Sequence, residues 1–434
     1  MNEASREGAE TQIDLASYRL RCREWLRDNL PLAADARKDI SDEERWARAR
    51  ELQKILYDGG FAGICFPREY GGQGLTPAHQ AIFTEESHDY ELPLLLNLPT
   101  LAICAPTLLK VGTEQQKKQH LGAVIRGEEV LVEFLSESHS GSDLAGARTR
   151  AEWNGSQWIL NGSKIWTSSA YVGDYGMCLA RTDWDVPKHK GLTMFLVPVR
   201  APGVTVRRIR QVNGNSEFCE EFFDNVAVGP EAVLGTVNGG WEVATDRFFF
   251  SRTALGGGNP YCSGDHDQSV AISRGMKVEG AHALLRVHRD AWPHEPIPDA
   301  VIDAYVMETA RDALATRITA AVRAKTMPIE AAAMLRLFHA ECDWKCVDAG
   351  LAVAGSYAAA VDEHASGPAT GDFGSAFLFR QATSLGGGST EMARNVISER
   401  VLRMPREAAA DINVPFRTVK KSADSGERGA KGGG

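Results

Sequence analysis

The sequence carries no excess of positive charge. Its 48 lysine and arginine residues are outnumbered by 57 aspartate and glutamate residues, which gives a formal net charge of −9 at pH 7. Such a chain is not attracted to nucleic acids or anionic membranes, so neither is predicted as its main partner. We find no apolar run long enough to cross a bilayer and expect no membrane insertion. The first residues, MNEASREGAETQID, contain no apolar signal-peptide core.

Cysteine is sparse and follows no disulfide framework. The 8 cysteines are scattered over 434 residues, which is typical of a reduced, cytoplasmic protein. His339, Cys342 and Cys346 lie at helical spacing and carry side chains that can bind a metal. A clear fourth ligand is missing, and buried cysteine behaves as a small hydrophobic residue. We therefore predict packing, and no metal site, for these three residues.

The pattern of the chain changes twice. A chain of this length exceeds one hydrophobic core, so several domains are expected. Residues 14–129 and 241–407 have apolar residues at helical spacing, whereas residues 130–240 are rich in β-branched and aromatic runs. The polar residues 1–13 and the Gly/Lys/Ser-rich residues 408–434 are predicted to be disordered.

Two Asn-Gly pairs punctuate the middle region. They lie in the stretches WNGS, residues 153–156, and LNGS, residues 160–163. Asn-Gly between β-branched or aromatic residues favours a tight hairpin turn. The sequence therefore predicts two hairpins here.

Five stretches together carry a family resemblance. They read LSESHSGSDLAGARTRA, NGSKIWTSSA, HKGLTMFLVPVRAPGVTVRRIR, FFDNVAV and GGWEVA. The chain from Asp14 to Glu407 resembles the acyl-CoA dehydrogenase family. The resemblance implies a mostly α fold with a central β-barrel, in which an N-terminal helical domain and a C-terminal helical bundle flank the barrel. It also implies FAD as cofactor, an acyl-CoA substrate and an acceptor similar to electron-transfer flavoprotein.

The resemblance also implies which residues contact the ligands. Positions matching the flavin contacts of the family are Phe134, Leu135, Ser136, Gly141, Ser142, Trp166, Thr167, Ser168, Ser389 and Thr390. Of these, Trp166 would stand against one face of the flavin ring, and Ser168 would lie near its reactive nitrogen. Positions matching substrate contacts are Ser142, Arg252 and Gly388. Taken alone, Trp166 is read as a core residue and the SGSD stretch as a helix cap or turn, and only the joint match of the motifs favours ligand contact.

The catalytic base of the family is missing from both of its usual positions. The stretch SLGGGSTEMARNVISER places Gly387 where many members carry a glutamate, and RFFFSRTALGGG places Ser251 at the alternative position. Abstraction of an α-proton from a thioester needs a positioned base, and serine without an adjacent base is a poor one. The triple glycine before a helix can still bring backbone N–H groups close to an anion. Phe249 also replaces a polar residue that often meets the CoA arm.

Weak replacements for the base exist elsewhere in the chain. Glu391 is the carboxylate nearest to Gly387, but a glutamate in the first helical turn is also favoured by the helix dipole. Asp265, His266 and Asp267 form a carboxylate–imidazole cluster that can act as a base. The same GDHD stretch also reads as an exposed polar loop.

A second motif is missing as well. Family members usually carry Arg-x-x-Phe-Gly after the first long helix of the bundle, and a glutamine further on. Both reach the adenosine half of FAD in a neighbouring subunit. Here the first region reads NPYCSGDHDQSVAISRGMKVEG, and Leu351 replaces the glutamine. The resemblance thus implies only half of a flavin site.

Three functions remain open on the sequence. The first is an acyl-CoA dehydrogenase subunit that works in a hetero-oligomer with an acyl-CoA dehydrogenase-like partner. The second is a homo-oligomeric flavoenzyme with a displaced base, or with an oxidase- or monooxygenase-like reaction. The third is a non-catalytic partner subunit. In each case the C-terminal helices are expected to form the interface with another chain.

Overall fold

The computed structural model describes residues 14–36, 40–255, 259–262, 280–359, 373–409, 411 and 413–419. Asp265, His266 and Asp267 lie outside the described residues. The same is true of residues 1–13 and of residues 420–434, for which disorder was predicted.

The N-terminal part is helical. Its α-helices are α1 (Leu15–Asn29), α2 (Asp42–Asp58), α3 (Pro77–Glu86), α4 (Ala105–Val111) and α5 (Glu114–Ile125). Ser41 and Thr113 begin α2 and α5 with capping boxes, in which side chain and backbone satisfy each other's hydrogen bonds. Gly59 ends α2, as its position after the apolar pattern predicts.

One N-terminal stretch is more apolar than the sequence analysis allowed. Residues Leu94–Val111 form successive helical segments with a kink at Leu98, where φ is −119° and ψ is 127°, and their mean hydropathy is 1.6 over 18 residues, so by length and composition they are long and apolar enough to cross a membrane. Our statement that no run is long enough was therefore wrong. However, 72% of this stretch is buried inside the protein, where it serves as a core helix.

The middle part is a single eight-stranded sheet. Its strands are β1 (Leu131–Phe134), β2 (Arg150–Trp153), β3 (Trp158–Ser168), β4 (Tyr175–Arg181), β5 (Leu192–Pro198), β6 (Val204–Arg208), β7 (Phe218–Val228) and β8 (Val233–Leu234). The strand order is β6-β7-β3-β2-β4-β5-β8, and β1 pairs in parallel with β4.

One of the two predicted hairpins is present. The turn at residues 154–157 joins antiparallel strands β2 and β3. The second prediction was wrong, because residues 160–163 lie inside β3 and pair with β7. Gly162 adopts φ +150°, which accommodates a bulge in the ladder rather than a chain reversal.

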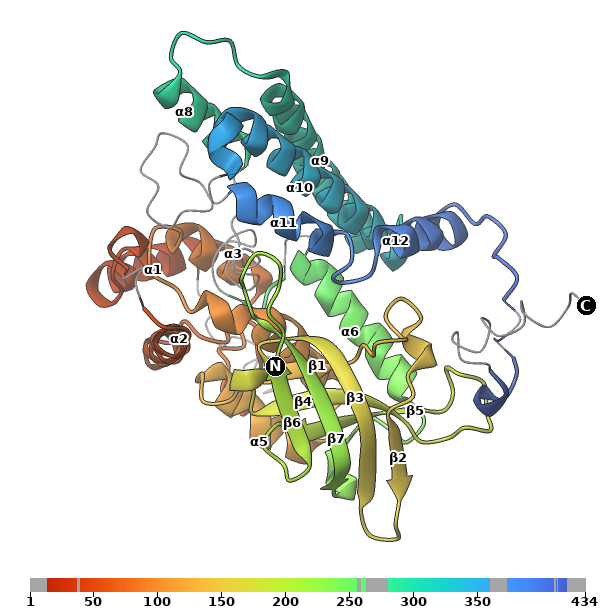
Figure 1. The fold of residues 1–434 in the computed structure, drawn as a ribbon. Helices are drawn as coiled ribbons and strands as arrows, with labels where there is room; N and C mark the ends of the chain where they lie inside the picture. The colour runs from red at the N-terminus through yellow and green to blue at the C-terminus, as the bar shows by residue number, and fades with distance from the viewer. Residues whose placement is uncertain are drawn as a thin grey trace, which may run out of the picture.

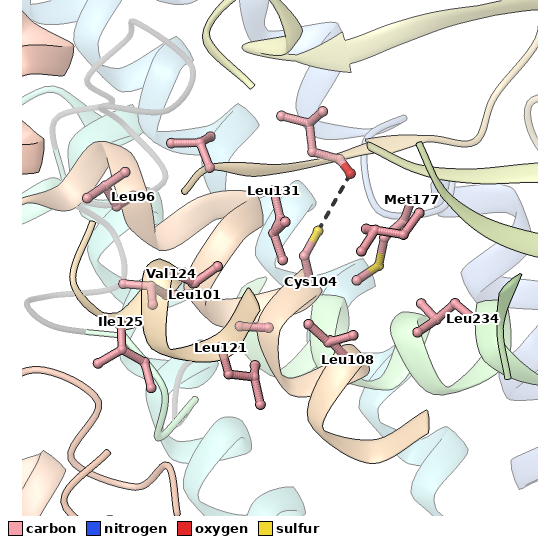
Figure 2. Packing of buried hydrophobic residues seen from close by; sticks show 14 of the residues in the cluster. Leu96, Leu101, Cys104, Leu108, Leu121, Val124, Ile125, Leu131, Met177 and Leu234 are labelled. Atoms are coloured by element: carbon pink, nitrogen blue, oxygen red, sulfur yellow. Dashed lines mark hydrogen bonds between the residues drawn. The ribbon is translucent and has the colours of Figure 1, made fainter. Parts of the chain in front are cut away.

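Helices and sheet share one hydrophobic core. Leu101, Cys104 and Leu108 pack against Leu131 of β1 and Met177 of β4, as Figure 2 shows. The thiol of Cys104 also donates to the carbonyl oxygen of Val132, with 3.9 Å between sulfur and oxygen. The N-terminal helices are therefore fixed to one face of the sheet.

The C-terminal part is again helical and confirms the predicted fold class. Its helices are α6 (Gly240–Leu255), α8 (Ala281–Ala291), α9 (Asp299–Arg323), α10 (Ala332–Ala354), α11 (Phe373–Thr383) and α12 (Thr390–Val396), followed by a π-helical turn η11 (Ile397–Val401). Helix α6 runs between the sheet and the other helices, which gather on the far side of it (Figure 1). A second core joins α8, α9 and α10.

Part of the polar tail is folded onto the sheet. Asp411 and residues 413–419, which include the short helix η12 (Phe416–Thr418), return to the loop after β4. Phe416 is only 1% exposed. Composition predicted disorder for this stretch because one buried aromatic residue does not stand out in a polar sequence, and the prediction fails for these residues.

Candidate functional site

Trp166 stands on the surface of the sheet. A bulge in β3 between Ile165 and Thr167 gives Trp166 a φ of +68°, and its side chain is 56% exposed. The ring meets Phe218 edge-on, with centroids 6.0 Å apart, and Phe218 in turn stacks on Phe379 of α11. The alternative reading of Trp166 as a core residue is therefore wrong. Its flat apolar ring is presented where the sheet meets the C-terminal helices.

The next residue, Thr167, points inward. Its hydroxyl oxygen lies 2.8 Å from Oε2 of Glu221 and 3.1 Å from the carbonyl oxygen of Glu133. Burial raises the pKa of Glu221 to about 8. A hydroxyl has a single hydrogen, so it satisfies both oxygens only if Glu221 is protonated and donates to it. Thr167 therefore links the carboxyl group of Glu221 to strand β1, and its side chain is not free to lie beside Trp166.

The SGSD stretch forms a compact turn. The hydroxyl of Ser140 donates to the carbonyl oxygen of Asp143 over 2.6 Å, and the backbone N–H of Gly146 donates to the same oxygen over 2.8 Å. Ser142 is exposed, and a Cβ on Gly141 would meet no described atom within 4 Å. The turn thus offers an accessible hydroxyl and open backbone.

A buried ion pair supports this turn from inside. Lys164 is fully buried and donates to Oε1 of Glu137 over 2.8 Å and to the carbonyl oxygens of Leu135 and Leu179. Burial opposes ionisation of Glu137, but Lys164 and the backbone N–H groups of residues 148 and 149 outweigh it and lower its pKa. These polar groups are all satisfied, so the pair fixes the turn to β3.

The predicted flavin contacts at residues 134–136, on and just after β1, differ in how far their side chains are exposed. Phe134 is fully buried and packs on Phe223, and Leu135 is 7% exposed. Both side chains belong to the core, and the Phe134 ring packs on strands β7 and β4 of the sheet itself. Ser136 is half-buried, and its carbonyl oxygen accepts from the N–H of Ile165. Of these three residues, Ser136 is the least buried, and its backbone is bonded to the residue that precedes Trp166.

The glycine loop is held by an arginine that the sequence analysis missed. Arg336 of α10 is 5% exposed and donates to the carbonyl oxygens of Thr383 and Gly386, at 2.5 and 2.7 Å. Gly387 and Gly388 have φ of +79° and +102°, a region that disfavours other residues. In the sequence, Arg336 stands out only as a single arginine in an apolar helical pattern. That pattern does not show that its partners are the carbonyl oxygens of the glycine loop.

The helix start after the loop follows the expected capping pattern. Ser389 accepts a hydrogen bond from the N–H of Met392, and both Ser389 and Thr390 are 7% exposed. Glu391 lies in the first turn and is exposed. Its own backbone N–H and the side chain of Ser389 lower its pKa, which makes its carboxylate a weaker base.

The usual base positions hold no carboxylate. Ser251 on α6 is 2% exposed, and Gly387 has no side chain. Arg252 follows Ser251 and is half-buried, and burial lowers its pKa. Phe249 is 36% exposed on the same helix. Among the described residues, the positions matched to the family's base are thus Ser251 and Gly387, and their neighbours on α6 are an arginine and a phenyl ring; the Glu330 carboxylate lies close enough to Arg252 to oppose the lowering of its pKa.

Helix α6 is tied to the sheet by a second buried ion pair. Arg247 of α6 binds both carboxylate oxygens of Glu133 on β1. Both side chains are nearly buried, and the attraction of Glu133 keeps the pKa of Arg247 raised although burial opposes it. The backbone carbonyl of the same Glu133 lies beside Thr167. Glu133 therefore connects α6 to the strand that carries Trp166.

The remaining candidates pack inside the C-terminal helices. Cys342 and Cys346 belong to the core of α8, α9 and α10, and Leu351 packs against it. In the part of the chain that the structure describes, no three His, Cys, Asp or Glu side chains are grouped to hold a metal ion. Leu351 has no polar side-chain group with which to contact an adenosine.

Fold, turn and glycine loop together define the class of protein. Sequence models of the acyl-CoA dehydrogenase N-terminal, middle and C-terminal domains match residues 14–128, 133–226 and 238–402. The chain belongs to the acyl-CoA dehydrogenase family, a family of flavin-dependent oxidoreductases.

Particular relatives resemble it along most of its length. Acyl-CoA dehydrogenase IpdE1 of Mycobacterium tuberculosis is 31% identical over 407 residues, which cover 91% of this chain and 99% of that protein. FadE34 of the same organism is 41% identical over 209 residues, but the match spans only 29% of it. Among solved structures, a chain of the Tcur3481-Tcur3483 steroid ACAD is 26% identical with a TM-score of 0.71, covering 91% of this chain and 98% of that one. A chain of the ChsE4-ChsE5 complex from Mycobacterium tuberculosis shares the fold at a TM-score of 0.67 and 22% identity.

Proposed function

We propose that this chain is one subunit of a hetero-oligomeric, FAD-dependent acyl-CoA dehydrogenase. The observation that carries the proposal is the contrast between Trp166, exposed on its bulge, and the two base positions, Ser251 and Gly387, that lack a carboxylate. An exposed aromatic ring is available that would serve as a ligand wall, whereas neither matched position carries a carboxylate that would take the proton.

The residues fit one half of FAD. An isoalloxazine ring needs a flat apolar wall and a few hydrogen bonds at its polar edge. Trp166 would supply the wall, and Ser168, Ser136 and the backbone of Gly141 would supply polar contacts. At the adenosine half the fit fails, since Leu351 is apolar and packed in the helical core. We therefore propose that an unlike subunit completes the cofactor site.

The catalytic roles are also divided between this chain and its partner subunit. When bound, FAD would supply an acceptor for the hydride that leaves the β-carbon of the acyl group. Ser142 and Arg252 would orient the acyl-CoA, and the backbone of Gly388 would lie beside its thioester. The α-proton needs a carboxylate that this chain does not offer at either position, so we assign that role to the partner subunit.

The relatives and the cysteines of this chain support proposals for its substrate, its electron acceptor and its location. The Tcur3481-Tcur3483 structure is named a steroid ACAD and joins two components in its name, which supports our proposal of an unlike partner and a steroid acyl-CoA for this chain. We propose an acceptor similar to electron-transfer flavoprotein. All 8 cysteines are free thiols, which supports the proposed cytoplasmic location.

Co-expression with a candidate partner tests the proposal. The partner should be a family member that keeps a glutamate at the position matching Gly387. Acyl-CoA oxidation is followed with an artificial electron acceptor and a panel of acyl-CoAs that includes a steroid acyl-CoA. We expect turnover only from the pair. Turnover by this chain alone would favour a homo-oligomeric flavoenzyme with a displaced base or another reaction. Inactivity of a correctly assembled pair would favour a non-catalytic subunit.

A further inference from the structure

The folded part of the tail forms a strap across the sheet domain. We use the name C-terminal strap for Asp411 and residues 413–419. The N–H of Phe416 donates to the carbonyl oxygen of Val186, and the N–H of Arg417 donates to that of Trp184, both over 2.9 Å. Figure 1 shows this dark-blue end of the chain beside the loop that joins β4 to β5. The strap therefore adds backbone hydrogen bonds to that loop.

Phe416 covers a buried arginine. The guanidinium of Arg181 lies 3.6 Å from the centre of the Phe416 ring, and Arg181 is fully buried. Its nitrogens donate to the carbonyl oxygens of Ala145, Ala147 and Lys188. Burial lowers the pKa of Arg181 to about 10. Removal of the ring would let water reach the guanidinium and weaken the hold on residues 145–147.

A lysine links the strap to the same turn. Nζ of Lys188 lies 2.7 Å from Oδ2 of Asp411 and 3.0 Å from Oδ1 of Asp143. Burial disfavours the charge on Lys188, yet the hydrogen bonds to both carboxylates raise its pKa. Asp143 directly follows Ser142, so the strap reaches the SGSD turn through one side chain.

A third contact reaches the far end of the turn. Nη2 of Arg148 donates to the carbonyl oxygen of Val419 over 3.1 Å, and the Arg148 guanidinium lies 4.9 Å from the Phe416 ring centre. The strap thus holds both ends of residues 143–148, while Gly141 and Ser142 remain open.

We propose that Phe416 and Asp411 are positioning residues for the SGSD turn. Through Arg181, Lys188 and Arg148 they fix the backbone that presents Gly141 and Ser142. The consequence for ligands rests on the proposed function, because only there do these two residues contact flavin and acyl-CoA. The mechanical link between strap and turn does not depend on any ligand.

Hydrogen exchange measured by mass spectrometry on the full chain without ligand tests the link. Phe416→Ala should speed exchange in peptides that cover residues 141–148 by roughly tenfold, because the local opening energy falls. Peptides of α9 and α10 should be unaffected. Phe416→Leu, which keeps an apolar cover, should restore most of the protection. The matched control is Thr418→Ala, since the Thr418 hydroxyl donates to Pro415 within the strap.

The exchange results decide the proposal in either direction. Unchanged exchange in residues 141–148, or an equal increase in α9 and α10, would overturn it. Asp411→Asn provides a second variant if Phe416→Ala fails to fold, and it should speed exchange around Asp143 to a smaller extent. Unchanged exchange around Asp143 in Asp411→Asn would also overturn the proposed link between the C-terminal strap and the SGSD turn.

Kinetics of the active pair test the ligand consequence separately. Phe416→Ala should raise KM for acyl-CoA several-fold more than it lowers kcat, because substrate orientation is lost rather than the proton-transfer group. Faster exchange with an unchanged KM would overturn the positioning role toward substrate. A pair without turnover would contradict the proposed function instead, and the exchange data would still decide the strap.

Discussion

Thr167 and Glu221 are joined by a hydrogen bond of 2.8 Å between Oγ1 and Oε2 across strands β3 and β7. Glu221 is fully buried, and among the described residues its other oxygen has no hydrogen-bond partner. A charged carboxylate in this place would be poorly solvated, whereas a neutral one can donate to Thr167. The contact lies directly behind the strand position that exposes Trp166.

This relationship predicts a pH dependence of stability. The pKa of Glu221 is about 8 in the folded protein, and its ordinary value is 4.5. A raised pKa means that the folded state binds the proton more tightly, so stability is full below about pH 4.5 and falls as pH rises to about 8. Glu221→Gln keeps a neutral hydrogen-bond donor at this position and should remove the decrease in stability with rising pH. The Tm of this variant at pH 8 should therefore be higher than that of the unmodified chain. Thermal unfolding of both proteins between pH 5 and 9 measures this dependence of Tm on pH.

An exposed glutamate provides the control for this experiment. Glu152 on β2 has a side chain 67% exposed. Glu152→Gln should leave the slope of Tm against pH nearly unchanged, because water solvates its carboxylate in both states. Equal slopes for Glu221→Gln and the unmodified chain would show that Glu221 is already ionised at neutral pH.

Trp166 should contribute to flavin retention without contributing to folding. We expect Trp166→Ala to weaken FAD binding in the assembled protein by roughly tenfold, since an aromatic wall is lost. Its exposure of 56% predicts little change in Tm. Trp153 is 46% exposed at the β2–β3 turn and provides the matched control. Flavin titration by fluorescence would contradict the assignment if the two tryptophan variants behaved alike.

Gly387 should resist substitution. Its φ of +79° disfavours any residue with a Cβ, so Gly387→Ala should cost about 1 kcal/mol of unfolding free energy. Gly387→Glu should lower the unfolding free energy by a similar amount. It should not make the chain active without a partner, because the cofactor site is still incomplete. Denaturant unfolding measures the change in stability, and the dehydrogenase assay measures the activity. Activity of Gly387→Glu without a partner would show that the flavin site is complete in one chain.

An apolar stripe on α9 is expected to form a subunit interface. Ile302, Tyr305 and Val306 lie at helical spacing and are 49%, 41% and 59% exposed. A stable interface buries at least about 1,200 Å² in total, and a charge at its centre disrupts it. Val306→Lys should therefore shift the protein toward the monomer in light scattering. Leu20→Lys on α1, also 59% exposed, is the control. A monodisperse monomer in the unmodified chain, with and without a family partner, would contradict the interface.

Two local features were predictable because contiguous residues carry them. The SGSD stretch forms a turn, and Ser389 caps a helix as its position predicts. The ligand contacts assigned to Trp166 and to this turn stay predictions. Long-range partners were not predictable. Glu221 lies 54 residues from Thr167 and Arg247 lies 114 residues from Glu133, and nothing in either local pattern specifies such a pair.

Two local patterns were misleading for a physical reason. The Asn-Gly pair at residues 161 and 162 has turn composition, but the neighbouring strand β7 supplies hydrogen bonds that keep the chain extended. Phe416 lies in a polar stretch, but Arg181 and Trp184 provide a buried surface for it. In both cases tertiary contacts outweighed local propensity.

The flavin content of the purified protein tests the central claim most directly. The chain is purified alone and after co-expression with an acyl-CoA dehydrogenase-like partner that keeps the glutamate, and the visible flavin absorbance is compared with the protein concentration. We predict little flavin on the chain alone and a near-stoichiometric band on the pair, which Trp166→Ala reduces. A stoichiometric flavin band on the chain alone would contradict the claim that its cofactor site is only half built.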